Sequence, residues 1–151
     1  MILEKLHREV MAAGYKNLVI WLYNWTEPFL NQNLPEFVKI GKKHANWVGI
    51  SSNLSFSKNE LLKKTILEEP HGIKVSVSGF NQEVYQKNHR GGNVEQVKKN
   101  LIYISNLIKQ CHLDIRRFFV GYHMYVDNLG VELKKMKAFC DCLGDLARAN
   151  R

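Results

Sequence analysis

Ile73-Lys-Val-Ser-Val-Ser78 alternates branched apolar side chains with polar ones, which is the pattern of a β-strand with one buried face. After Gly91-Gly-Asn93, apolar residues recur at intervals of three and four from Val94 to Cys111, which predicts a long helix. A strand followed by a helix is the repeating part of the βαβ crossover, from which parallel sheets are built.

The same alternation continues toward both ends of the chain. The predicted helices are residues 2–13, 35–44, 57–69, 94–111 and 129–143, and the predicted strands are residues 18–23, 47–52, 73–78 and 116–126. The third helix begins at a capping-box pattern, Ser57-Lys-Asn-Glu60. This order predicts an α/β fold with about four parallel strands. A doubly wound sheet and part of a (β/α) barrel both fit it, and both bind ligands at the carboxyl ends of the strands.

The chain has 151 residues, of which 45% are hydrophobic, and this suits a single domain over residues 1–151. Its longest apolar runs, such as Leu18 to Tyr23, are far shorter than the roughly 20 residues of a membrane-spanning helix. No signal-peptide pattern begins the chain. We therefore expect a cytoplasmic protein without a membrane partner.

Three cysteines, Cys111, Cys140 and Cys142, are an odd number, so a secreted disulfide framework is not expected. Cys140 and Cys142 are two positions apart in a predicted helix, where their side chains diverge by about 200° and do not readily share a metal. No metal ligands are predicted, and the cysteines are interpreted as ordinary core or surface residues.

The net charge of +8 would favour a polyanionic partner if the basic residues were clustered. They are instead scattered over different predicted elements, without a long run and without interleaved stacking aromatics. The basic pairs are Lys42–Lys43, Lys63–Lys64, Lys98–Lys99, Arg116–Arg117 and Lys134–Lys135. We interpret them as solvated helix faces, so nucleic acid is not an expected partner.

Polar side chains share one face of two predicted strands. Ser76 and Ser78 alternate with valines, and Gly49, Ser51 and Asn53 alternate along the preceding strand. Because helices cover one face of such a sheet, hydroxyls on the other face are available to a polar ligand. Hydrogen bonds from these serines to nearby backbone are the alternative.

Further polar groups follow the strand ends. Glu27 lies in a loop that Pro28 holds extended, and its carboxylate is suited to accept from an ammonium group; a surface turn is the alternative. The segment His89-Arg-Gly-Gly92 offers a guanidinium for a carboxylate and glycines that admit a close backbone approach. His123 is predicted on the polar face of the last strand, although a lone histidine is more often a structural residue.

In this order the motifs resemble the radical S-adenosylmethionine (radical SAM) superfamily, most closely the members that carry a C-terminal cysteine-rich SPASM domain. Their order and spacing over about residues 1 to 146 carry the resemblance, rather than any single motif. The motifs are Leu22-Tyr-Asn-Trp-Thr-Glu-Pro-Phe-Leu30, Ser51-Ser-Asn53, Val75-Ser-Val-Ser-Gly79, Glu83, Tyr85 and His89-Arg-Gly-Gly92.

The resemblance implies an incomplete (β/α)6 barrel from a family that binds SAM and a [4Fe–4S] cluster and cleaves SAM to a 5′-deoxyadenosyl radical. By this analogy, the Glu27 segment meets the methionine ammonium and the end of the Ser51–Asn53 strand meets the ribose. The regions of Ser76 and Arg90 meet the methionine carboxylate, and either His89 or Arg90 corresponds to the family's arginine. The candidate cofactor-binding residues are Thr26, Glu27, Pro28, Ser51, Ser52, Asn53, Ser76, Ser78, His89, Arg90 and His123.

The chain departs from the family in its cysteines. The family holds its cluster with a Cys-x3-Cys-x2-Cys loop after the first barrel strand, whereas no cysteine here precedes Cys111. This polypeptide alone is therefore not expected to assemble the cluster. Thr26 replaces a glycine of the family, and neither a sixth strand nor a SPASM domain is recognised up to Arg151.

Three hypotheses follow. The first is a truncated or degenerate radical SAM domain that binds SAM and is inactive alone. The second is a non-catalytic or split-enzyme partner of a separate polypeptide that supplies the cluster loop, and the third is a basic α/β module that binds a polyanion. An incomplete barrel leaves edge strands at residues 18–23 and 116–126, so self-association is also expected.

Overall fold

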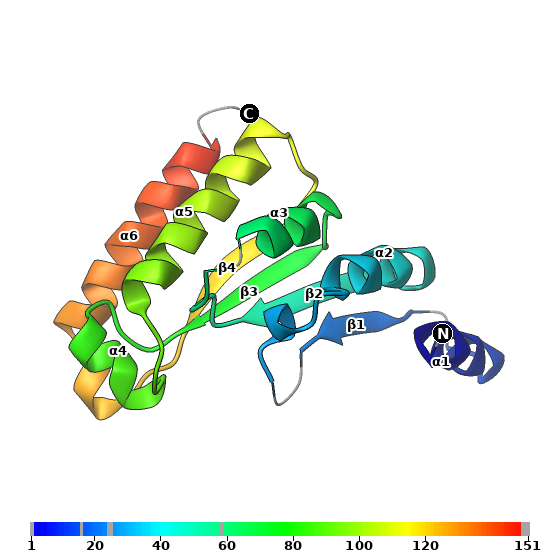
Figure 1. The fold of residues 1–151 in the computed structure, drawn as a ribbon, viewed down its shortest axis with the longest axis horizontal. Helices are drawn as coiled ribbons and strands as arrows, with labels where there is room; N and C mark the ends of the chain where they lie inside the picture. Colours follow the sequence, from blue (N-terminus) through cyan, green and yellow to red (C-terminus); the bar gives the residue numbers. More distant parts are fainter. Residues whose placement is uncertain (1, 16, 24–25, 58, 149–151) are drawn as a thin grey trace. The chain divides into compact units, whose positions relative to one another are not determined.

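The computed structural model describes residues 2–15, 17–23, 26–57 and 59–148. Its strands form one four-stranded, all-parallel sheet in the order β1-β2-β3-β4 (Figure 1). They are β1 (Val19–Leu22), β2 (Trp47–Ser52), β3 (Gly72–Val77) and β4 (Arg117–Tyr122). The predicted α/β class with four parallel strands is confirmed.

Helices separate the strands along the chain. They are α1 (Ile2–Ala12), α2 (Leu34–His44), α3 (Asn59–Leu67), α4 (Gln82–Asn88), α5 (Val94–Gln110) and α6 (Val131–Arg148), with short 3-10 helices η1 (Pro28–Leu30) and η2 (Val126–Asn128). Within the described ranges, none of the helices is long and apolar enough to cross a membrane.

The chain divides into two compact units. The first comprises Met1–Ser52, Asn59–Lys74 and Asp114–Phe118, and the second comprises Asn53–Lys58, Val75–Leu113 and Phe119–Arg151. Each unit has a buried apolar core of its own. The core residues include apolar side chains that recur at helical and strand spacing in the sequence.

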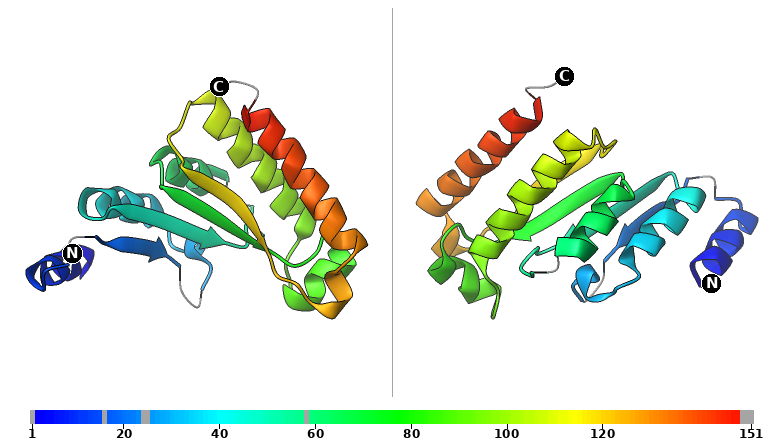
Figure 2. Two further views of the ribbon diagram at one scale, coloured as in Figure 1. Left: turned by 180° about the vertical axis from the view of Figure 1, so that it is seen from behind. Right: turned by 45° about the horizontal axis from the view of Figure 1, so that its top comes forward.

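In the first unit, helix α2 covers one face of the paired strands β1 and β2. The strands pair with Val19 opposite Trp47 and Leu22 opposite Ile50. Val48 and Ile50 of β2 are fully buried, and a Cβ added to Gly41 of α2 would lie 3.0 Å from a methyl of Val48. Seen from behind, β1 and β2 lie in front of α2 (Figure 2).

The opposite face of the first unit is covered by aromatic rings that lie over glycines. A Cβ at Gly49 would lie only 2.6 Å from the Trp21 ring, and one at Gly72 would lie 2.7 Å from the Trp47 ring. The guanidinium carbon of Arg117 lies 5.5 Å from the centroid of Trp47. Glycine is therefore required at both positions, since a side chain there would displace a ring.

In the second unit, helices α5 and α6 pack together and supply most of the core. Buried residues of this unit include Val75, Val77, Tyr85, Val94, Val97, Leu101, Ile104, Leu107, Met136 and Leu143. The two helices run side by side in both views (Figures 1 and 2). The apolar spacing of the long helix predicted before Cys111 is therefore the spacing of its buried face.

The structure corrects two element predictions. Helix α4 was not expected, because only Tyr85 of its seven residues is buried and a single apolar residue gives no periodicity. The strand predicted over residues 116–126 was too long: it ends at Tyr122, and the chain then turns into η2. Met124 and Val126, which continue the alternation of a strand in the sequence, are 68% and 97% exposed.

Two described helices begin later than the sequence predicts. The capping-box pattern at the start of α3 includes Lys58, which lies outside the described residues, and the described helix begins at Asn59. The last helix begins at Val131 rather than Leu129, because Gly130 has a positive φ of 68° that is incompatible with a right-handed helix.

Within the second unit, a buried amide of α5 holds the segment from Leu54 to Phe56. Asn100 is 2% exposed, and its Nδ2 donates to the carbonyls of Leu54 and Phe56, each at 2.8 Å. Leu54 has a positive φ of 53°, so the segment needs external support to keep this conformation.

Replacement of this amide should destabilise the fold. We expect Asn100→Leu to lower the free energy of unfolding by about 1–3 kcal/mol, because the buried carbonyl of Leu54 and the half-buried carbonyl of Phe56 both lose this donor. Asn106→Leu, at an exposed position of the same helix, should change it by less than about 0.5 kcal/mol. Urea denaturation monitored by circular dichroism measures both, and equal effects would contradict the role of Asn100.

Candidate functional site

The first unit holds one carboxylate at the carboxyl end of β1. Glu27 caps η1 and accepts at Oε1 from the backbone N–H of Phe29 (3.3 Å) and from the hydroxyl of Ser52 (2.7 Å). Pro28 occupies the first position of η1 and keeps Glu27 extended, at φ −67° and ψ 119°. The half-buried carboxylate is thus fixed between the loop after β1 and the end of β2.

The other described candidate residues of the first unit are Thr26 and Pro28, which adjoin Glu27 in the sequence, and Ser51 and Ser52, which end β2. Thr26 is exposed, and Ser51 is half-buried where Ser52 is buried. Asn24 and Trp25, which belong to the motif that contains Glu27, lie outside the described residues. Ser52 therefore has a defined structural role, the orientation of Glu27.

A serine–histidine pair lies after β3 in the second unit. The fully buried hydroxyl of Ser78 lies 2.6 Å from Nδ1 of His89. The His89 ring stacks on Tyr85 with centroids 4.5 Å apart and planes 5° apart. Burial, and to a smaller extent the charge of His123, lowers the pKa of His89. His89 is accordingly held neutral at neutral pH.

A buried asparagine joins the strand ends around this pair. Nδ2 of Asn128 donates to the carbonyls of Ser78 and His123, each at 2.7 Å. Its Oδ1 accepts from the N–H of Tyr125 at 2.7 Å, and its own carbonyl accepts from the hydroxyl of Tyr122 at 2.9 Å. His123 is exposed, but this loop brings its ring to 6.5 Å from that of His89.

The remaining candidates of the second unit have different environments. Arg90 is exposed and Ser76 is half-buried. Asn53 accepts at Oδ1 from the N–H of Ser55 (2.8 Å), which forms a local turn. A Cβ at Gly92 would lie 2.8 Å from the Tyr85 ring and 3.0 Å from the carbonyl of His89. The absence of a side chain at Gly92 therefore makes room for Tyr85 and the His89 backbone of this chain.

A second carboxylate is engaged by the loop after β3. Glu132 is 8% exposed and accepts from the N–H groups of Phe80 (2.9 Å) and Asn81 (2.8 Å) and from the Asn81 amide (2.6 Å).

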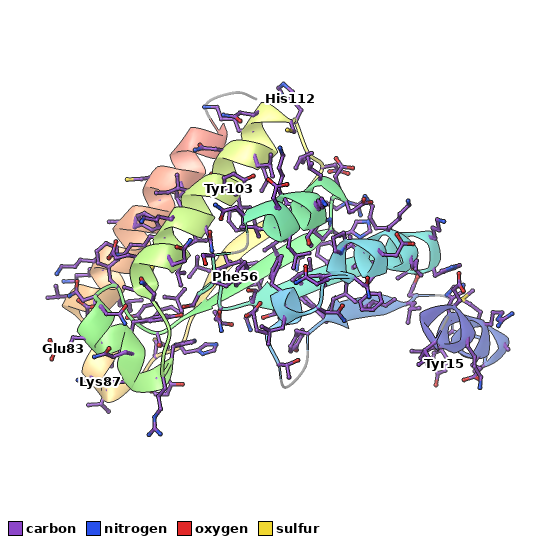
Figure 3. The ribbon with its side chains drawn as sticks, in the orientation of Figure 1. Tyr15, Phe56, Glu83, Lys87, Tyr103 and His112 are labelled. Atoms are coloured by element: carbon purple, nitrogen blue, oxygen red, sulfur yellow. The ribbon has the colours of Figure 1, made fainter. Side chains whose placement is uncertain are left out.

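The pKa of Tyr122 is raised, mainly by burial and then by the charges of Glu132 and Asp127. Asp127 lies 3.5 Å from Lys87, which projects from α4 (Figure 3).

Two of these structural residues, Asn128 and Glu132, were not among the candidates. Asn128 stands between an aspartate and Leu-Gly, which is the composition of a turn and the one signal that the sequence offers. Glu132 has the spacing of an ordinary solvated residue in the first turn of a helix. Its partners are about fifty positions away in the chain, so the sequence alone could not reveal its burial.

The described residues do not fit a metal ion or an iron–sulfur cluster. Among them, no three histidine, cysteine, aspartate or glutamate side chains group as metal ligands would. Cys111 and Cys142 are exposed and Cys140 is half-buried with a pKa raised mainly by burial, which opposes the thiolate that iron requires.

Compared with known proteins, the chain matches no protein-family model and no curated protein.

The neutral state of His89 is testable by titration. We expect its apparent pKa to lie below 6.5, and His123→Gln to raise it, because the charge of His123 opposes protonation of His89. The chemical shift of the His89 Cε1–H in NMR spectra reports both values, and a wild-type pKa of 6.5 or above would contradict the expectation.

The lowered pKa of His89 makes the stability of the fold depend on pH. Because the folded pKa is lower than the unfolded one, the contribution of neutral His89 is complete above about pH 6.5 and is lost as the pH falls through the folded pKa. A His89→Gln variant should therefore show a weaker loss of stability between neutral and mildly acidic pH than the wild type.

Proposed function

We propose that this chain is a SAM-binding segment of the radical SAM type, incomplete or degenerate, and inactive as an enzyme by itself. The observation that carries the proposal is the anchored carboxylate of Glu27. It stands in the segment that, by resemblance, meets the methionine ammonium, and it follows the carboxyl end of a parallel strand, where α/β folds bind ligands.

The anchoring of Glu27 suits recognition of an ammonium group. Two donors to Oε1, from Ser52 and Phe29, set the plane of the carboxylate before any ligand arrives. An ionised acceptor forms a shorter and stronger hydrogen bond to an ammonium than a neutral one does. Preorganisation also reduces the entropy lost on binding. Exposed Thr26, in place of a family glycine, adds bulk beside this acceptor.

Of the two residues that the resemblance relates to the methionine carboxylate, Arg90 suits an anion better than His89 does. The lowered pKa of His89 leaves it without charge at neutral pH, and its Nδ1 is engaged with Ser78. Arg90 is exposed, and its guanidinium can meet a carboxylate in bidentate fashion. His89 and Ser78 then support the backbone that leads into Arg90.

The cluster does not fit the residues of this chain, so no radical chemistry is assigned to it alone. A separate polypeptide that supplies the Cys-x3-Cys-x2-Cys loop would be needed for SAM cleavage. A non-catalytic role of the same scaffold beside such a partner is the alternative form of the proposal.

SAM binding is the direct test. We expect Glu27→Gln and Arg90→Ala each to weaken SAM binding by about tenfold or more, because each substitution removes one charged hydrogen-bonding partner. Glu36→Gln and Arg116→Ala, at exposed positions, are the matched controls and should bind as the wild type does. Isothermal titration calorimetry measures all five proteins, and absence of SAM binding by the wild type would refute the function.

Reconstitution tests the missing ligands. After anaerobic treatment with iron and sulfide, we expect the chain to retain far less iron and sulfide than one cluster per polypeptide. Reconstituted chain should also leave SAM intact in the presence of a reductant. Stoichiometric cluster uptake with formation of 5′-deoxyadenosine would show that the chain is a complete enzyme.

A further inference from the structure

Strand β4 has an outer edge that no strand covers among the described residues, since it is last in the order of the sheet. None of its residues is fully buried, in contrast to β2 and β3. Its sequence, Arg117-Phe-Phe-Val-Gly-Tyr122, has no proline and no positive-φ residue, and its one charged side chain, Arg117, stands at the first position, so the usual protections of an exposed edge are missing from Phe118 to Tyr122.

The hydrogen bonds of β4 identify which backbone groups face outward. The N–H of Arg117 donates to the carbonyl of His71, and the N–H of His123 donates to the carbonyl of Val77. Since alternate residues of a strand direct their backbone groups to opposite sides, odd-numbered residues face β3. The N–H and C=O groups of Phe118, Val120 and Tyr122 therefore point to the open edge.

We propose that this edge pairs antiparallel with β4 of a second copy of the chain, about a two-fold axis at Val120. Val120 then lies opposite its own copy, and Phe118 lies opposite the second copy's Tyr122. All three outward residues fall in hydrogen-bonded pairs, and the register places two aromatic rings across from each other. The pairing is isologous, so it closes at a dimer.

Size complementarity supports a second copy as the occupant. On the face of β4 that carries Arg117 and Phe119, this register sets Phe119, which is 42% exposed, opposite the second copy's Gly121. The sheet already uses this arrangement, with Trp21 over Gly49 across the β1–β2 pair. A large exposed aromatic over a glycine is a favourable cross-strand pair in this fold.

The charge of the chain does not oppose the pairing locally. Arg117 is the only charged residue of β4. In the antiparallel register the two copies of Arg117 lie at opposite ends of the interface, about 20 Å apart. This distance exceeds the Debye length of about 8 Å at physiological ionic strength, so their repulsion is screened.

Proline substitutions at the two edges of the sheet test the proposal. Val120→Pro removes an outward N–H without breaking the bonds to β3, and should weaken dimerisation by about tenfold or more. Val19→Pro is the matched control: the carbonyl of Leu18 faces β2, so the N–H of Val19 faces outward at the other edge. Sedimentation velocity over a concentration series measures the dimer, with circular dichroism to verify folding.

The wild type should form dimers as the concentration rises, and Val19→Pro should do the same. A wild type that stays monomeric to several hundred micromolar would overturn the proposal. So would a dimer that Val19→Pro abolishes and Val120→Pro leaves intact, and assembly into open filaments would instead show pairing of unlike edges.

Cross-linking tests the register without proline. In a background where the three native cysteines are serine, oxidation should link Val120→Cys to its own copy, since only residue 120 meets itself. Phe118→Cys, which faces the second copy's Tyr122, is the matched control and should remain unlinked. Equal linkage of both variants, or linkage of Phe118→Cys alone, would overturn the register.

Discussion

The buried amide of Asn128 is the interaction on which the second unit depends. It satisfies the carbonyls of Ser78 and His123, which follow two neighbouring parallel strands, and it closes the turn at Tyr125. Without it, the buried carbonyl of Ser78 would lose this donor, at a cost of about 1–3 kcal/mol. The position of Ser78, and with it the environment of His89, follows from this one side chain.

The strands and long helices were predictable because burial imposes a period on the sequence. Val94, Leu101 and Ile104 are buried at the spacing that the sequence displays. The end of β4 was not predictable in this way, since Met124 and Val126 alternate as strand residues do but are exposed. An amide network replaces the sheet ladder there, and such a network leaves no periodic pattern.

The candidate site was predictable in its positions and not in its partners. Parallel α/β topology places polar residues at strand ends, which is why Glu27 and Ser78 were recognised. The bond from Ser52 to Glu27 spans 25 positions of the chain, and the pair of Ser78 with His89 spans 11. Glu132, with a full set of donors from Phe80 and Asn81, shows that a buried carboxylate can be wholly structural.

The aromatic rings over glycines couple positions that lie far apart in the sequence. Any larger residue at Gly49 would meet Trp21, and any larger residue at Gly72 would meet Trp47. Neither ring can keep its place if its glycine changes, and loss of either ring would uncover the glycine beneath it. Residues 21 and 49, and likewise 47 and 72, are therefore expected to change together during evolution, so that a homologue with a smaller residue at 21 would tolerate a side chain at 49.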